Sequence, residues 1–150
     1  MRGISADRAP MPTGRRCRPG ADADLPPIDT IRAMADPRIL VSFDIDGTLE
    51  AGDPPGPITF ALVAEVKARG CVIGSASDRT LSEQRAIWQQ AGISVDFVCN
   101  KHRLSEITSH FNCQRMLHIG DTSLDEYYAK LAGFEFYDVA DLPDSWLSLI

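Results

Sequence analysis

Short apolar segments that alternate with stretches of helical periodicity constrain the fold of this chain more than any other feature. Five strands are expected, over residues Ile39–Phe43, Cys71–Ala76, Phe97–Cys99, Met116–Ile119 and Phe134–Val139. Parallel strands need long crossover connections, and right-handed crossovers place helices over both faces of a sheet. The alternation therefore predicts an α/β fold, a doubly wound Rossmann-like three-layer sandwich around a five-stranded parallel sheet.

Four helices are expected between these strands, over residues 57–69, 80–91, 103–111 and 124–131. Pro57 suits the first position of its helix, because the proline ring already holds a helical φ and has no N–H to satisfy. Trp88 is expected to pack in the core and Trp146 to anchor the C-terminus, and a subunit interface is the alternative for both.

Residues 1–36 differ from the rest of the chain in composition. They are rich in Pro, Gly, Ala and Arg, and their prolines interrupt any periodic apolar pattern. We expect residues 1–36 to be disordered, or residues 1–33 to precede a true start at Met34. Residues 37–150 are expected to form one domain, since a domain of roughly 100–150 residues has its own hydrophobic core.

The charge of the chain is unevenly spread. Residues 1–33 hold six Arg and four Asp, whereas the remaining residues hold nine basic and seventeen acidic side chains. The expected domain is therefore acidic, which disfavours a nucleic-acid polymer as a partner. No apolar run approaches the ~20 residues of a membrane span, and no secretory signal is present. The four cysteines, widely spaced, form no zinc or disulfide pattern, so a cytoplasmic protein is expected.

Polar side chains gather where the expected strands end. Ligands of open parallel sheets bind beyond the carboxyl ends of the strands, so these residues are the candidate site. The segments that follow the first four strands are Asp44–Leu49, Ser75–Arg79, Asn100–Lys101 and Gly120–Asp125. Carboxylates, hydroxyls and an ammonium group are thus expected along one edge of the sheet.

This set of side chains matches phosphoryl transfer through an aspartyl intermediate. A carboxylate attacks phosphorus readily only if a divalent cation offsets the charge of the incoming phosphate. Asp44 and Asp121 are expected to hold Mg²⁺, which prefers oxygen ligands. Ser77 and Lys101 are expected to bind phosphoryl oxygens, and Asp46 to act as an acid or base.

Each motif also has a purely structural explanation. Asp-Gly is a common turn, and Ser77 is a good helix N-cap. The structural explanation for Lys101 is a solvated surface position, as for most lysines. Asp121 and Asp125 fit an N-cap followed by an acid in the first helical turn. However, a turn does not require two Asp that flank an apolar residue before Gly-Thr, and all four motifs occur in order, which favours the chemical interpretation.

The segment from Ile39 to Val139, about two thirds of the chain, resembles the haloacid dehalogenase superfamily of Mg²⁺-dependent phosphatases. The first motif of that family, DxDx(T/V), is matched by Asp44, Asp46 and Thr48. The resemblance implies that Asp44 is the nucleophile and that Asp46 is the general acid/base, which also offers its backbone carbonyl to the metal. It further implies substrate contacts by Gly47 and Thr48.

The second motif of the family is a hydroxyl at the end of the second strand. Ser75 and Ser77 both fit, and the spacing from Gly70 in similar family members favours Ser77. The segment after Ser77 is also similar to the TGR-type segment of some members, so the resemblance implies that Arg79 binds substrate.

The third and fourth motifs follow in the same order. The resemblance implies that Lys101 is the lysine of the third motif, although His102 stands where a proline often follows that lysine. His102 is therefore an additional candidate for substrate contact, and the alternative is that it is an exposed loop residue. Gly120–Asp125 matches the fourth motif, GDxxxD, which implies that Asp121 and Asp125 join the metal ligands.

The resemblance implies a member without a cap domain. The segment Glu50–Pro57 is long enough only for a flap, and Cys99 leads directly to Lys101. An open site suits a large substrate, or a homo-oligomer in which a neighbouring subunit completes the pocket. The TGR-like spacing is similar to that of tetrameric sugar-acid phosphatases.

The expected function is a Mg²⁺-dependent phosphomonoesterase that acts on a small phosphorylated metabolite. Phosphotransfer to a second acceptor, as in a mutase, is the nearest alternative. A response-regulator receiver domain is disfavoured, because its phosphorylated Asp should follow the third strand, where this chain has Cys99 and Asn100. A non-catalytic interaction module on the same fold stays open.

Overall fold

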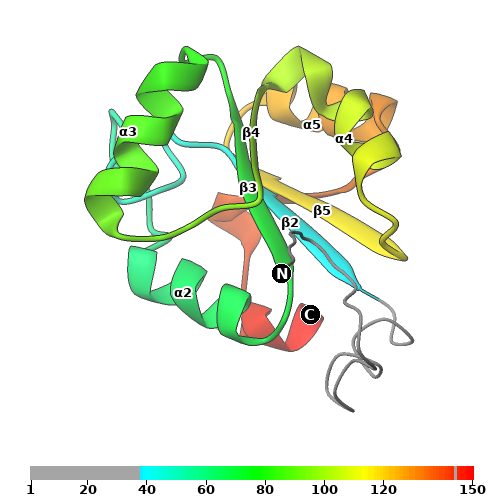
Figure 1. Ribbon diagram of the computed structural model, residues 1–150, viewed down its shortest axis with the longest axis horizontal. Coiled ribbons are helices and arrows are strands. Elements are labelled where there is room, and N and C mark those ends of the chain that lie inside the picture. Colours follow the sequence, from blue (N-terminus) through cyan, green and yellow to red (C-terminus); the bar gives the residue numbers. More distant parts are fainter. Residues whose placement is uncertain (1–37, 144) are drawn as a thin grey trace, which may run out of the picture. The chain divides into compact units, whose positions relative to one another are not determined.

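Five strands of the described chain lie parallel in one sheet. The computed structural model describes residues 38–143 and 145–150, so the expectations for residues 1–36 lie outside the described residues. The strands are β2 (Ile39–Phe43), β3 (Val72–Ser77), β4 (Phe97–Asn100), β5 (Arg115–Gly120) and β6 (Glu135–Asp138). Their order is β4-β3-β2-β5-β6, and each neighbouring pair is parallel (Figure 1). The predicted five-stranded parallel sheet is confirmed.

Helices cover both faces of this sheet. They are α2 (Phe60–Ala68), α3 (Leu81–Ala91), α4 (Leu104–His110) and α5 (Ser123–Leu131), and short 3-10 helices are η1 (Lys101–Arg103), η2 (Val139–Asp141) and η3 (Trp146–Leu149). In Figure 1, α2 and α3 lie on one side of the strands, and α4 and α5 lie on the other. Among the described helices, none is long and apolar enough to cross a lipid bilayer.

The central strand β2 separates two apolar clusters, because successive side chains of a strand point to opposite faces. Val41 and Phe43 pack in one cluster with Val63 of α2 and Trp88 of α3. Leu40 packs in the other cluster, under α4 and α5. Both faces of the sheet are therefore covered, which explains why the strands are apolar along most of their length.

The predicted start of the first helix is wrong by three residues. Thr59 is the N-cap of α2, and its hydroxyl accepts a hydrogen bond from the backbone N–H of Leu62 at 3.1 Å. Pro57 lies outside the helix, because Ile58 is held in a short parallel bridge to Leu49 and is buried. The other predicted boundaries agree with the structure to within one residue.

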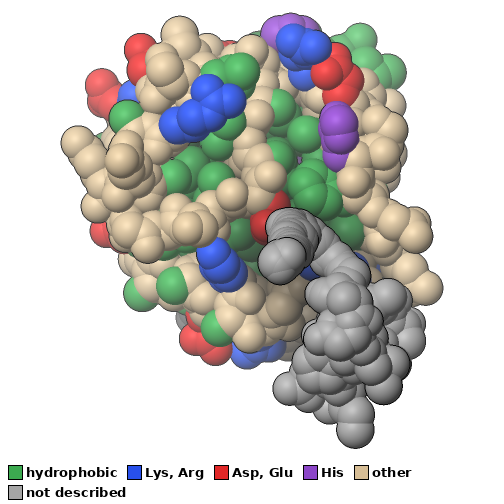
Figure 2. Space-filling view, viewed as in Figure 1, with side chains coloured by type: hydrophobic (Ala, Val, Ile, Leu, Met, Phe, Trp, Pro, Cys, Tyr) green, Lys and Arg blue, Asp and Glu red, His purple; other side chains and the backbone are tan. Residues whose placement is uncertain are grey.

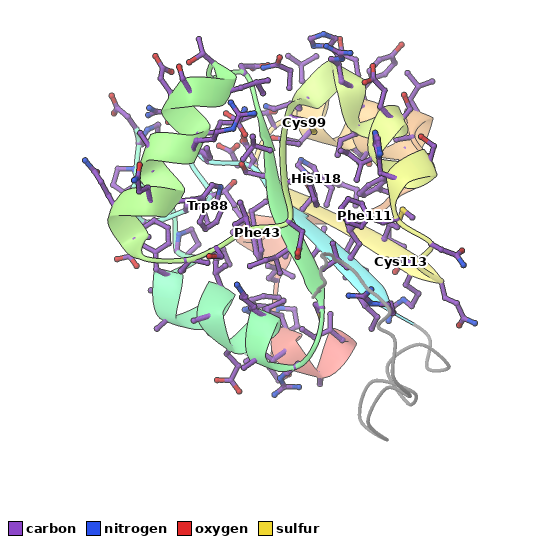
Figure 3. All side chains as sticks on the ribbon, in the orientation of Figure 1. Phe43, Trp88, Cys99, Phe111, Cys113 and His118 are labelled. Carbon is purple, nitrogen blue, oxygen red and sulfur yellow. The ribbon has the colours of Figure 1, made fainter. Side chains whose placement is uncertain are left out.

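Trp88 joins three elements of the fold. Its indole Nε1–H donates to the hydroxyl of Ser75 on β3 at 3.0 Å, and Phe60 of α2 packs edge-on against its ring, with centroids 5.8 Å apart. Trp88 is labelled in Figure 3, beside the central strands. Trp88 and Trp146 are both buried in the same apolar cluster, which agrees with the expected core packing of Trp88 and with the expected anchoring of the C-terminus by Trp146.

We expect Trp88→Phe to lower the free energy of unfolding by about 2 kcal/mol, because it removes buried ring atoms and the hydrogen bond to Ser75. Urea unfolding followed by circular dichroism measures this change. Trp146→Phe is the matched control, since it removes the same atoms without that hydrogen bond, and it should cost less. Equal losses in the two variants would contradict the role of the Ser75 bond.

Candidate functional site

The carboxyl ends of four strands bring the predicted polar residues to one edge of the sheet. Asp44 follows β2, Ser77 ends β3, Lys101 follows β4 and Asp121 follows β5. The backbone N–H of Asp44 donates to the carbonyl of Ile119 at 2.9 Å, which continues the β2–β5 pairing into the site. The parallel topology thus places these side chains together.

Three carboxylates form a tight cluster at this edge. One oxygen each of Asp44, Asp121 and Asp125 lies within 4.8 Å of the other two, so the group could hold a metal ion. The Oδ1 atom of Asp121 is buried and has no hydrogen-bond partner among the described residues. A buried carboxylate oxygen without a donor is unfavourable unless a cation or water meets it, so the donor set fits a hard cation.

Two glycines make room for this cluster. Gly47 has φ +77°, and a Cβ at this position would collide with the carboxyl group of Asp121. A Cβ on Gly120 would collide with the carboxyl group of Asp125. Gly47, which was predicted to contact substrate, therefore lies directly against a candidate metal ligand. The hydroxyl of the neighbouring Thr48 is buried and has no partner among the described residues.

Asp125 is the best-satisfied carboxylate of the cluster. Its Oδ1 accepts from His118 Nε2 at 2.9 Å and lies 3.2 Å from Lys101 Nζ. Its Oδ2 accepts from the backbone N–H groups of Asp121 and Thr122 and from the Thr122 hydroxyl. Burial alone would raise the pKa of Asp125, but the hydrogen bond from His118, followed by the charge of Lys101, lowers it.

Asp44 has the opposite electrostatic environment. Burial, followed by repulsion from Asp125, raises the pKa of Asp44 to about 8, although Lys101 opposes the shift. Burial alone would lower the pKa of Lys101, but the carboxylates of Asp44 and Asp125 outweigh it and raise the pKa. Without a cation, these surroundings therefore favour the protonated form of Asp44 and the charged form of Lys101.

Asp46 lies outside the three-carboxylate cluster and is paired with Arg79. The guanidinium Nε lies 3.2 Å from both carboxylate oxygens, and Nη2 donates to Oδ1 at 2.8 Å. The backbone N–H of Asp53 donates to the same Oδ1 at 2.7 Å. The hydrogen bond from Arg79 lowers the pKa of Asp46. The predicted acid/base residue and the predicted substrate-binding arginine thus bind each other.

The structure distinguishes the two serines of β3. Ser75 is engaged on both sides, since its hydroxyl donates to Gln84 at 2.6 Å and accepts from Trp88. Ser77 stands at the end of the strand, and its hydroxyl oxygen accepts from the backbone N–H of Arg79 at 3.1 Å. The hydroxyl hydrogen of Ser77 has no acceptor in the part of the chain that the structure describes, so Ser77 is the serine with a donor to offer.

Two histidines lie near the site, and the sequence analysis singled out only one of them. His102 is exposed and packs edge-on against Tyr128, with ring centroids 6.4 Å apart. His118 is fully buried in β5 and contacts Asp125, and sequence reasoning missed it. The available signal was a polar residue in the middle of an apolar strand, between Leu117 and Ile119.

Basic side chains lie apart from one another on the face that Figure 2 shows, rather than in one patch.

Comparisons with models of protein families, with curated proteins and with solved structures find no match to this chain. The fold therefore defines the class, an α/β protein with a Rossmann-like parallel sheet and a carboxylate cluster at its carboxyl edge.

Without metal, Asp44 should make the folded protein less stable as the pH rises. Its folded-state pKa, about 8, lies above the ordinary value of 3.8, so between these values the folded state keeps a proton that the unfolded state has released. Stability present at low pH is therefore lost as the pH rises toward the folded-state pKa. Relative to Asp44→Asn, the parent should lose on the order of 1 kcal/mol per pH unit between pH 5 and pH 8.

Urea unfolding in EDTA across this range measures the difference between the two proteins. Asp141→Asn, a change at an exposed acid of η2, is the control and should follow the parent. A constant difference between the parent and Asp44→Asn from pH 5 to pH 8 would show that Asp44 does not hold the proton.

Proposed function

We propose that this protein is a phosphomonoesterase of the haloacid dehalogenase type, with Asp44 as the nucleophile and Mg²⁺ as the cofactor. The observation that carries the proposal is the pairing of a buried lysine with a carboxylate cluster in which Asp44 and Asp125 are buried. Lys101 Nζ lies 3.7 Å from Asp44 Oδ2, and Asp121, beside Asp44, has an oxygen without a partner among the described residues. A nucleophile, a group for phosphoryl oxygens and a cation site thus occur at one strand edge.

Asp44 and Asp121 would hold the metal, with the backbone carbonyl of Asp46 as a further oxygen ligand. Asp125 lies next to them, but its oxygens already accept several hydrogen bonds. When bound, Mg²⁺ would offset the negative charge that the carboxylates and the phosphoryl group bring together. This charge also favours the ionised form of Asp44, which is the form that attacks phosphorus.

In the first chemical step, a carboxylate oxygen of Asp44 forms a bond to phosphorus as the bond from phosphorus to the ester oxygen breaks. Asp46 gives a proton to the departing oxygen, which leaves as an alcohol. Lys101 and Ser77 hold the other phosphoryl oxygens by a charge and a hydroxyl donor. In the second step, Asp46 removes a proton from water, which attacks the aspartyl phosphate and releases inorganic phosphate.

The pair of Asp46 and Arg79 gives Arg79 a role in this proposal. While Arg79 is bound, it favours the ionised form of Asp46, which cannot protonate a leaving group. An anionic substrate offers the guanidinium another partner. We propose that Arg79 moves from Asp46 to the substrate, which frees Asp46 to carry its proton.

The open core supports hydrolysis over transfer. In the described residues, a loop of sixteen residues, 44–59, joins β2 to α2, and η1 follows β4 directly, so no cap domain interrupts the core. Water can then reach the intermediate, which favours hydrolysis over a mutase reaction. The strand order does not support the receiver alternative, because receivers have the order 2-1-3-4-5, whereas this chain, counted along the sequence, has 3-2-1-4-5.

Asp44→Asn should lower turnover by several orders of magnitude, because it removes the nucleophile and one metal ligand but hardly changes the side-chain volume. Release of inorganic phosphate from a panel of phosphorylated metabolites, with Mg²⁺ and with EDTA, tests the parent and the variant. Asp141→Asn is the control and should keep full activity. A folded Asp44→Asn protein with near-normal turnover would rule out the covalent mechanism, and an inactive parent would reject the proposed function.

Asp46→Asn should slow alkyl phosphates much more than p-nitrophenyl phosphate, because an alkoxide needs a proton to leave and a nitrophenolate does not. The ratio of kcat/KM for the two substrates, compared between parent and variant, is the measurement. Equal losses on both substrates would assign Asp46 to positioning rather than to proton transfer.

Mg²⁺ should stabilise the folded parent by about 2.7 kcal/mol at a concentration 100-fold above its dissociation constant. Asp121→Ala should abolish most of this gain, because it removes the oxygen that has no other partner in the described residues. Thermal melts with Mg²⁺ and with EDTA compare the parent, Asp121→Ala and the control Asp141→Ala. If Asp121→Ala gained as much from Mg²⁺ as the parent, the ion would bind elsewhere.

A further inference from the structure

His118 is a fully buried side chain that the proposed chemistry does not use. It lies on the face of β5 that α4 and α5 cover, and its ring packs against Phe136 with centroids 6.4 Å apart. Figure 3 labels His118 among the side chains on this side of the sheet. Both ring nitrogens have partners, Ser42 Oγ at Nδ1 and Asp125 Oδ1 at Nε2, each at 2.9 Å.

The partners of His118 determine which nitrogen carries a proton. Asp125 is a carboxylate that only accepts, so Nε2 is assigned as the donor to it. In the neutral ring, Nδ1 then accepts from the Ser42 hydroxyl. Ser42 lies opposite His118 in the register of β2 and β5, so the backbone pairing of the two strands fixes this contact.

The two oxygens of Asp125 are held in different ways. Oδ2 is bound locally, by the Asp121 and Thr122 groups of its own turn. Oδ1 has two contacts, His118 and Lys101. Of the two contacts of Oδ1, Lys101 belongs to the candidate site and His118 does not. His118 therefore restrains the rotation of the Asp125 carboxylate from outside both the site and the turn of Asp121 and Thr122.

Lys101 depends on that oxygen for its position. Its Nζ lies 3.2 Å from Asp125 Oδ1, but 3.6 Å from Asp78 and 3.7 Å from Asp44. Asp78 is largely exposed, so its pull on the ammonium group is screened by water. The closest and most deeply buried anchor of Lys101 is thus the atom that His118 holds.

We propose that His118 is a positioning residue, which orients Asp125 so that Lys101 is presented to the phosphoryl group of the substrate. The role of Lys101 toward phosphate rests on the proposed function, whereas the placement of Lys101 by His118 does not. The chain of contacts runs from Ser42 in the central strand to His118, Asp125 and Lys101, and it joins the sheet interior to the site.

The crystal structure of full-length His118→Leu, compared with that of the parent, tests the placement directly. We expect the Asp125 carboxylate to rotate and Lys101 Nζ to leave Asp125 Oδ1, whereas His118→Gln, which keeps an N–H donor, should retain the contact. If His118→Leu does not fold, Ser42→Ala removes the partner on the other side of the ring and should loosen the same contact. An unchanged Asp125–Lys101 contact would overturn the inference, whether or not the protein is a phosphatase.

A double-mutant cycle tests whether His118 acts through Lys101. With p-nitrophenyl phosphate and Mg²⁺, His118→Leu should lower kcat/KM and the affinity for inorganic phosphate by about ten- to hundredfold, as for other residues that orient a site group from behind. His118→Gln should recover most of this loss. Phe136→Leu, a change beside the His118 ring, is the packing control and should stay near the parent.

The decisive comparison is with Lys101→Met. If His118 acts through Lys101, the double variant His118→Leu/Lys101→Met should be no worse than Lys101→Met alone. Additive losses, or a folded His118→Leu protein with parental kcat/KM, would overturn the inference. A parent that neither hydrolyses p-nitrophenyl phosphate nor binds phosphate would reject the proposed function, and the crystal structures would then decide the positioning role by themselves.

Discussion

The candidate site depends on the charge of one buried lysine, Lys101. The side chain of Lys101 is 5% exposed and is surrounded by Asp44, Asp78 and Asp125. A buried carboxylate without a counter-charge costs several kcal/mol, so the lysine that lies between these acids lowers the cost of bringing them together. The parallel sheet makes the arrangement possible, since four strands end at the same edge and η1 turns Lys101 inward directly after β4. The charge imbalance that remains is what a divalent cation would relieve.

The fold could be predicted from the sequence because its signals are local and repeated. Buried parallel strands must be apolar on both faces, and glycine or N-cap residues mark most helix ends, so the pattern specified both type and order. The exception is instructive. Pro57 has the local chemistry of a helix start, but the bridge between Ile58 and Leu49 holds the preceding chain extended, and Thr59 caps the helix instead. A tertiary contact between separate segments has no signature in a window of neighbouring residues.

Most members of the candidate site were predictable from the sequence, but His118 and the pairings between residues were not. The positions of Asp44, Lys101 and Asp121 after their strands follow from the topology alone. The bond between Asp46 and Arg79 joins residues 33 positions apart, and which partner an arginine chooses depends on geometry that no motif encodes. The contact between His118 and Ser42 spans 76 positions and follows only from the register of β2 against β5. Motifs identified the candidate groups, whereas the structure was needed to show which group contacts which.

The close approach of Gly47 to Asp121 has a consequence for how such a site can change over generations. The loop after β2 and the loop after β5 interlock there, because the space of a side chain at position 47 is already filled by the carboxyl group of residue 121. In any descendant of this sequence, a larger residue at 47 and an acid in this orientation at 121 are mutually exclusive. The conformations of the two loops are therefore coupled, since a side chain at position 47 fits only when the carboxyl group of residue 121 turns away.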